Sequence, residues 1–166
     1  DRQSVWKLTS GLLNLLGILM FVVGLIILIF TKPLLTLVVG HNLSPSQMHD
    51  AVIIMRLVAF NPLLFTISGI LTSMQQSLGR FFFYAVAPLL YNLSIIASAI
   101  IFSDVSGHAG GPWHLGIVGL GVGAIVGAAL QLLVILAGMR PLHFRYRPRI
   151  NWRSADFRLI LRRLPP

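Results

Sequence analysis

The chain has 166 residues, of which 56% are hydrophobic and only 10% are charged, and its mean hydropathy is +0.85. Globular proteins carry about 25% charged residues, so this composition excludes an ordinary water-soluble domain and indicates a membrane protein. Cysteine is absent, which excludes disulfides and thiol chemistry. Of the 13 lysines and arginines, eight follow residue 139, and beside a membrane this favours anionic lipid over nucleic acid as the partner.

The first apolar run covers residues 8–30, and a shorter apolar stretch continues past Pro33 to Val39. A bilayer core needs about 20 apolar residues, so the run predicts a transmembrane helix. We expect Pro33 to bend its outer end. Three glycines within the run, Gly11, Gly17 and Gly24, indicate close contact with a neighbouring helix.

The second predicted transmembrane helix covers residues 51–75, with Ser46 as its expected N-cap. Asn61 and Pro62 lie within it, and Pro62 removes an intrahelical hydrogen bond, so we expect a kink there. Residues 75–79 form a short polar turn. A turn this short predicts that the second and third helices are antiparallel neighbours.

The third predicted helix covers residues 80–102 and carries Pro88 and Asn92 near its middle. Backbone and side-chain polar groups at the centre of a bilayer need partners inside the protein. We therefore expect Pro88 and Asn92 to tie this helix to the second helix, or to the glycine face of the fourth.

The fourth predicted helix covers residues 115–138 and carries three glycines at four-residue spacing: Gly119, Gly123 and Gly127. This spacing puts all three on one face and lets another backbone approach closely. The partner is either a helix of the same chain, which we favour, or a second copy. Gln131 lies one turn further along this face, where a hydrogen bond across the contact is expected.

Residues 140–166 form a basic segment, with a predicted amphipathic helix over residues 154–164 that lies in the membrane interface. We expect four of its arginines to contact lipid headgroups: Arg140, Arg145, Arg147 and Arg149. The predicted fold is thus all-α, a polytopic transmembrane bundle of about four helices within residues 1–139 followed by this interfacial helix. The positive-inside rule places both ends of the segment in the cytoplasm.

No pattern in the sequence indicates an enzyme. The four acidic residues are scattered over loops and ends, the five histidines lie in loops, and no phosphate-binding motif is present. We therefore expect no catalytic residues, no metal site and no cofactor.

The polar residues within the predicted helices carry most of the functional information. Arg56 either reaches the outer interface along its own helix or faces a cavity that accepts an anionic headgroup. Asn61 and Asn92 either hold helices together or line such a cavity. Pro62 and Pro88 interrupt adjacent helices, which is typical of transporters, although purely structural kinks give the same pattern.

Four stretches of the chain resemble one family in combination. They are the run from Arg56 to Asn61-Pro62, the segment GILTSMQQSLGRF, the block AVAPLLYNLSII, and the segment GLGVGAIVGAALQLLVILAGMRPLHFRYRPRI. Together they resemble the MurJ/MviN family of lipid II flippases. Ser73 departs from the pattern, because the family often has asparagine at this position.

This resemblance implies fourteen helices in two lobes around a central cavity, with this chain as the third to sixth helices of the N-terminal lobe. It implies movement of a lipid-linked peptidoglycan precursor to the outer leaflet of a bacterial inner membrane by alternating access. The implied partners are this lipid-linked saccharide-pyrophosphate, anionic membrane lipids and the remaining helices of the transporter. We expect the chain to be a fragment that does not transport alone.

Two other interpretations stay open on the sequence. One is a flippase for a different polyprenyl-linked saccharide, which composition does not separate from a lipid II flippase. The other is a membrane scaffold that does not transport and that recruits partners through its basic tail.

Overall fold

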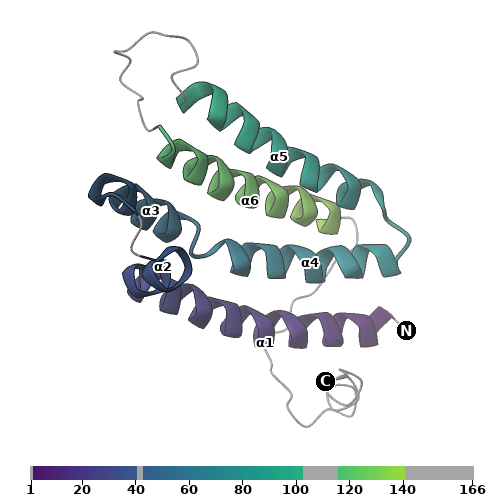
Figure 1. Cartoon of the computed structure of the whole chain (residues 1–166). Coiled ribbons are helices and arrows are strands. Elements are labelled where there is room, and N and C mark those ends of the chain that lie inside the picture. Colours follow the sequence, from purple (N-terminus) through teal and green to yellow (C-terminus); the bar gives the residue numbers. More distant parts are fainter. Residues whose placement is uncertain (1, 41–42, 103–115, 141–166) are drawn as a thin grey trace.

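The chain folds into a bundle of α-helices, seen here in a computed structural model that describes residues 2–40, 43–102 and 116–140 (Figure 1). No strand occurs within these ranges. The helices are α1 (Arg2–Ile29), α2 (Thr31–Val39), α3 (Pro45–Leu57), α4 (Asn61–Ser77), α5 (Phe82–Phe102) and α6 (Val118–Met139).

Four segments of the described chain are long and apolar enough to cross a membrane: Leu8–Ile29, Pro45–Ser77, Phe82–Phe102 and Val118–Met139. The predicted all-α transmembrane fold is therefore confirmed. The expected interfacial helix at residues 154–164 lies outside the described residues, as do Arg145, Arg147 and Arg149.

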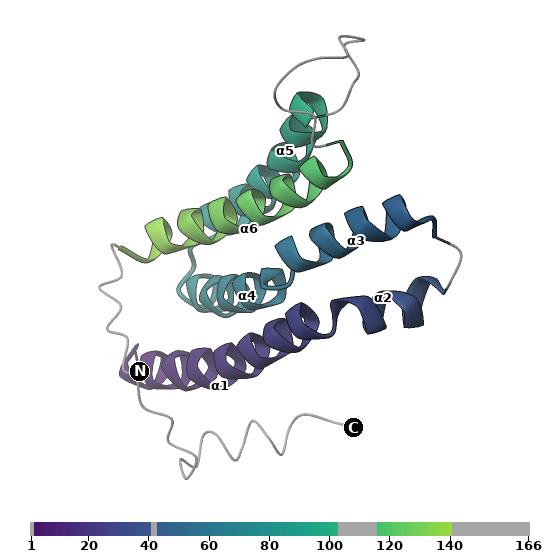
Figure 2. The ribbon, with the colours of Figure 1, turned by 90° about the vertical axis from the view of Figure 1, so that its left-hand side faces the viewer.

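The helices stack in the order α5, α6, α3–α4, α1–α2, which both ribbon views show (Figures 1 and 2). The expectation that the second and third spans are neighbours is therefore wrong. α6 lies between α4 and α5, and these two helices share few contacts. The physical reason is that α6 carries small residues on two faces, so it can pack closely against a helix on each side.

The buried core lies at the end of the bundle where α4 and α6 finish and α5 begins, which we call the Arg80 end. Its buried members are Leu71, Met74, Ala87, Ile135 and Met139, and Trp6 of α1 packs against them. Residues from α1, α4, α5 and α6 thus share one apolar cluster, which holds these four helices together at this end.

The first span is broken at Phe30 instead of bent at Pro33. α1 ends at Ile29, and Pro33 lies within the first turn of the separate helix α2, where its missing N–H costs no hydrogen bond. The buried Thr31 hydroxyl contacts the carbonyl oxygens of Ile27, at 2.7 Å, and Leu28, at 3.0 Å. These carbonyls belong to the last turn of α1, so the hydroxyl caps the helix end at the break.

The second span is likewise broken, between Val58 and Phe60, and not merely kinked at Pro62. Pro62 is the second residue of α4, and the Val58 carbonyl accepts from the Asn61 N–H at 2.9 Å in place of the missing donor. The break packs against α1 at Gly24, where an added Cβ would lie 2.8 Å from the Phe60 ring. Gly24 thus makes the close contact that the sequence indicated, whereas the added Cβ meets open space at the other two glycines, Gly11 and Gly17.

The N-cap of α3 is Ser44, so the prediction of Ser46 was wrong by two residues. The Gln47 N–H donates to the Ser44 hydroxyl at 3.3 Å, and the Gln47 side-chain oxygen accepts from the Ser44 N–H at 2.9 Å. This reciprocal capping box, followed by Pro45 as the first helical residue, satisfies two backbone donors that Ser46 cannot reach from inside the first turn.

The contact between α5 and α6 is the closest in the bundle, and it runs along the three spaced glycines. Gly119 lies against Phe102, Gly123 against Ser98, and Gly127 against Tyr91. The Ser94 hydroxyl donates to the Gly123 carbonyl at 3.0 Å, and the Ser98 hydroxyl donates to the Gly119 carbonyl. Because these three glycines of α6 have no side chains, residues of α5 occupy the space beside them.

We expect Gly123→Ala to destabilise the protein by about 1–3 kcal/mol, the usual cost of overpacking. The added Cβ would collide with the Ser98 Cβ and lie 3.1 Å from the Ser94 carbonyl oxygen, so α5 and α6 must move apart. Thermal unfolding of the purified protein in detergent measures this. Gly17→Ala is the control, because its Cβ meets open space. Equal stability of the two variants would contradict the expectation.

Candidate functional site

The structure places the three predicted cavity residues in different surroundings and does not bring them together. Arg56 is exposed in the last turn of α3. Asn61 is buried as the first residue of α4, with 7% of its surface exposed. Asn92 is exposed in the middle of α5. The groove between α1 and α4 is lined by none of the three.

Asn92 and Pro88 lie on the face of α5 that points away from α6. At 100° per residue, Asn92 is roughly 160° around the helix from Ser94, which contacts α6. The expectation that these residues tie α5 to its neighbours in this chain is therefore wrong. Because Pro88 has no N–H, the Tyr84 carbonyl loses its usual helical donor. This exposed face thus combines the Asn92 carboxamide with an interruption of the helical hydrogen bonds at Pro88.

Arg56 lies in the last turn of α3, far along the second span from Ser77. It is 21 residues from Ser77 along the span, roughly 31 Å at the rise of an α-helix, which is about the thickness of the hydrocarbon core. It also ends a half-helix, whose C-terminal carbonyl dipoles favour a cation. This position fits both an arginine that reaches the interface and one that meets an anionic headgroup there.

Three buried polar residues form a row on α4 at seven-residue spacing: Asn61, Ser68 and Gln75. The Gln75 amide donates to the Ile135 carbonyl of α6 at 2.7 Å. Three side-chain oxygens of this row have no hydrogen-bond partner among the described residues: Asn61 Oδ1, Ser68 Oγ and Gln75 Oε1. Of the three, the sequence predicted only Asn61 as a cavity residue, and the seven-residue spacing is the signal that groups it with the other two.

The remaining predicted residues lie on α6 and at its end. Gln131 is partly buried, but the described hydrogen bonds between α5 and α6 come from Ser94 and Ser98 and not from Gln131. Arg140 is exposed directly after α6, at the Arg80 end. Among the described residues, no cluster of His, Asp or Glu is suited to hold a metal ion.

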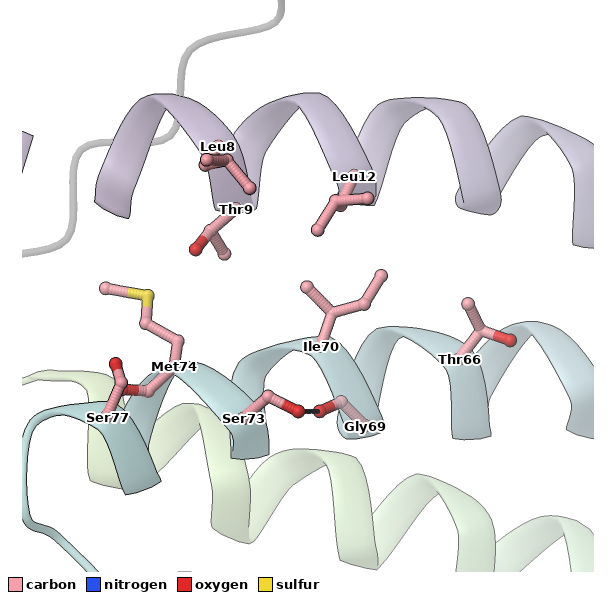
Figure 3. A pocket seen from close by; sticks show the side chains of 9 residues that line it. All are labelled: Leu8, Thr9, Leu12, Thr66, Gly69, Ile70, Ser73, Met74 and Ser77. Atoms are coloured by element: carbon pink, nitrogen blue, oxygen red, sulfur yellow. Dashed lines mark hydrogen bonds between the residues drawn. The ribbon is translucent and has the colours of Figure 1, made fainter. Parts of the chain in front are cut away.

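A groove with a volume of about 520 Å³ runs between α1 and α4 near the Arg80 end (Figure 3). Leu8, Thr9 and Leu12 of α1 face α4 across it. The α4 side is made of Thr66, Gly69, Ile70, Ser73, Met74 and Ser77. Sequence reasoning missed this groove, because its lining residues come from two spans whose contact the sequence does not specify.

We expect Asn61→Leu to leave the stability unchanged or to raise it. A buried oxygen without a partner costs about 1–3 kcal/mol, and leucine has a similar volume without this cost. Thermal unfolding in detergent measures the effect, with Ser98→Ala as the comparison. That variant loses a hydrogen bond between helices and should be less stable by about 0.6 kcal/mol. A clear loss of stability in Asn61→Leu would show that the amide has an essential partner.

Comparison with known proteins gives one match. A family model described as lipid II flippase MurJ matches residues 2–166, which is nearly the whole chain. Searches among curated proteins and among solved structures gave no match. The apolar helices, the two broken spans and the polar positions within them all lie inside the matched region. The chain therefore belongs to the MurJ family of lipid II flippases.

Proposed function

We propose that this chain is the third to sixth helices of the N-terminal lobe of a lipid II flippase. The observation that carries this proposal is the family match over residues 2–166. The substrate would be a lipid-linked saccharide-pyrophosphate, moved from the inner to the outer leaflet of a bacterial inner membrane. We infer from the distribution of basic residues that both ends of the segment lie in the cytoplasm, with α2 and α3 toward the outer side.

The packing supports a role for this segment as one moving body. α6 contacts α3, α4 and α5, and α1 packs on α4, so the helices form one connected unit. Alternating access in such transporters is largely the rocking of one rigid bundle against another. We infer that this unit rocks against helices outside the described chain, without rearrangement inside the α5–α6 contact.

The exposed polar groups support contact with the rest of the transporter or with substrate. Asn92, and the Tyr84 carbonyl that lacks its usual donor because of Pro88, would be costly facing lipid, because hydrocarbon offers no hydrogen bonds. We propose that this face of α5 turns toward the central cavity or toward a helix that lines it. Arg56, exposed near the outer boundary, would meet the pyrophosphate as the cavity opens outward.

The direct test of the function is complementation. The intact transporter that contains this chain is expressed in bacteria depleted of their own lipid II flippase. Rescue from lysis, with loss of the accumulated lipid II, is the expected result. Continued lysis, with lipid II still accumulated although the transporter is present in the membrane, would overturn the proposal and favour a flippase for a different polyprenyl-linked saccharide.

We expect Arg56→Ala in the intact transporter to lower the rate of flipping roughly tenfold or more. A hydrogen bond to a charged group contributes about 1.5–3 kcal/mol, and 1.4 kcal/mol is tenfold. Flipping is measured in reconstituted vesicles, at matched protein levels. The control is Lys32→Ala, which removes another exposed cation from the same side of the bundle. Unimpaired flipping by Arg56→Ala would exclude contact with the substrate.

A further inference from the structure

The first membrane span reaches the length of a bilayer core before α2 begins. Leu8–Ile29 has 22 residues, roughly 33 Å at the rise of an α-helix, and the hydrocarbon core is about 30 Å thick. Lys7 and Lys32 flank the span, and a lysine is costly within the hydrocarbon core, so the span has little room to slide along its axis. α2 therefore begins at the membrane boundary opposite the Arg80 end.

α2 turns away from the axis of α1 at this level. Figure 1 shows α2 nearly end-on, although α1 and the other spans run across the same view, and Figure 2 shows α2 lengthwise. The turn is made at the break, where the Thr31 hydroxyl caps the last carbonyls of α1 and Pro33 offers no N–H to the Ile29 carbonyl. Along the axis of α1, the nine residues of α2 would instead extend roughly 14 Å beyond the span.

The side chains of α2 divide into a polar side and an apolar side. Lys32 is exposed, and Thr36 lies one turn further along the same side. At 100° per residue, the midpoint of Leu37 and Val38 lies roughly 170° around the helix from the midpoint of this polar pair. Leu37 is 82% exposed and Val38 is 80% exposed, more than any other large apolar side chain in the described ranges. This division is typical of a helix that lies in a membrane interface.

The apolar side of α2 adjoins an exposed apolar surface at the end of the first span. Ile29 and Phe30 are both exposed. Within the described chain α2 packs against α1 and α3, and neither helix covers Leu37 or Val38. Lipid that surrounds the end of α1 thus reaches α2 without a gap, whereas Lys32 on the other side can extend its ammonium group to water.

We propose that α2 is an interfacial helix that lies on the leaflet opposite the Arg80 end, with Leu37 and Val38 among the acyl chains and the Lys32 ammonium at the headgroups. The occupant of the apolar side is lipid. The helix fixes the depth of the first span in the membrane. The proposal rests on the length of this span and on the two sides of α2, so it stands or falls independently of the proposed flipping function.

Spin-label accessibility in phosphatidylcholine vesicles tests the position of α2. The chain contains no cysteine, so Thr36→Cys, Leu37→Cys and Val38→Cys are made singly in the intact transporter, freed of any other cysteine, and labelled with a nitroxide. Collisions with oxygen, which dissolves among acyl chains, and with water-soluble NiEDDA are measured by electron paramagnetic resonance. We expect the ratio of oxygen to NiEDDA collisions at Leu37 and Val38 to exceed that at Thr36 at least about threefold, at a depth of about 5–10 Å.

Ser46→Cys is the aqueous control, because Ser46 is exposed in the first turn of α3, beyond the break in the second span. Its label should collide mainly with NiEDDA. Thermal unfolding at the temperature of the unlabelled transporter shows that each labelled variant is folded.

Two outcomes would overturn the proposal. Collision ratios at Leu37 and Val38 as low as the ratio at Ser46 would place α2 in water. Rare collisions with both reagents at Leu37 and Val38 would mean that protein, either another helix of the transporter or a second protein, covers the apolar side in place of lipid.

Discussion

The arrangement of the bundle depends on how closely α6 approaches its neighbours. Inside a membrane, apolar side chains gain little by leaving lipid for protein, so helices associate through close packing and hydrogen bonds. α6 meets this requirement on two sides. Gly119, Gly123 and Gly127 admit α5, while Gly121 lies 3.4 Å from side-chain atoms of Ile54 and Leu57 on α3, measured from an added Cβ. The last helix of the bundle is therefore its central one.

The existence of the helices could be read from the sequence, but their order in space could not. Runs of about 20 apolar residues predict the transmembrane helices, and the four-residue spacing of glycines on α6 predicts a close contact with another helix. A short turn such as residues 75–79 shows only that two helices are connected at one end. It does not prevent a later helix with smaller residues from packing between them, as α6 does.

The details that sequence reasoning missed have local physical causes. Pro33 and Pro62 each lie in the first turn of a helix, where proline is well tolerated because its missing N–H would have no partner there. Each proline therefore marks the start of a new helix, and the predicted bend is instead a break between two helices. The face of Asn92 was misjudged because α5 is apolar nearly all round, and its sequence does not mark which side packs. The three predicted cavity residues thus divide into Asn61, in the buried row on α4, and the exposed Arg56 and Asn92 on α3 and α5.

The contact of Gly24 with the break in the second span fixes the axial register of the first two spans. The Phe60 ring lies over Gly24 and stacks on Phe21, with ring centroids 5.7 Å apart. One turn along α1 in either direction the glycine is replaced by Met20 or Leu28. Sliding by a turn would press the ring into a large side chain. The contact therefore holds the two spans against translation along their axes, while the apolar cluster around Met74 holds them together at the Arg80 end.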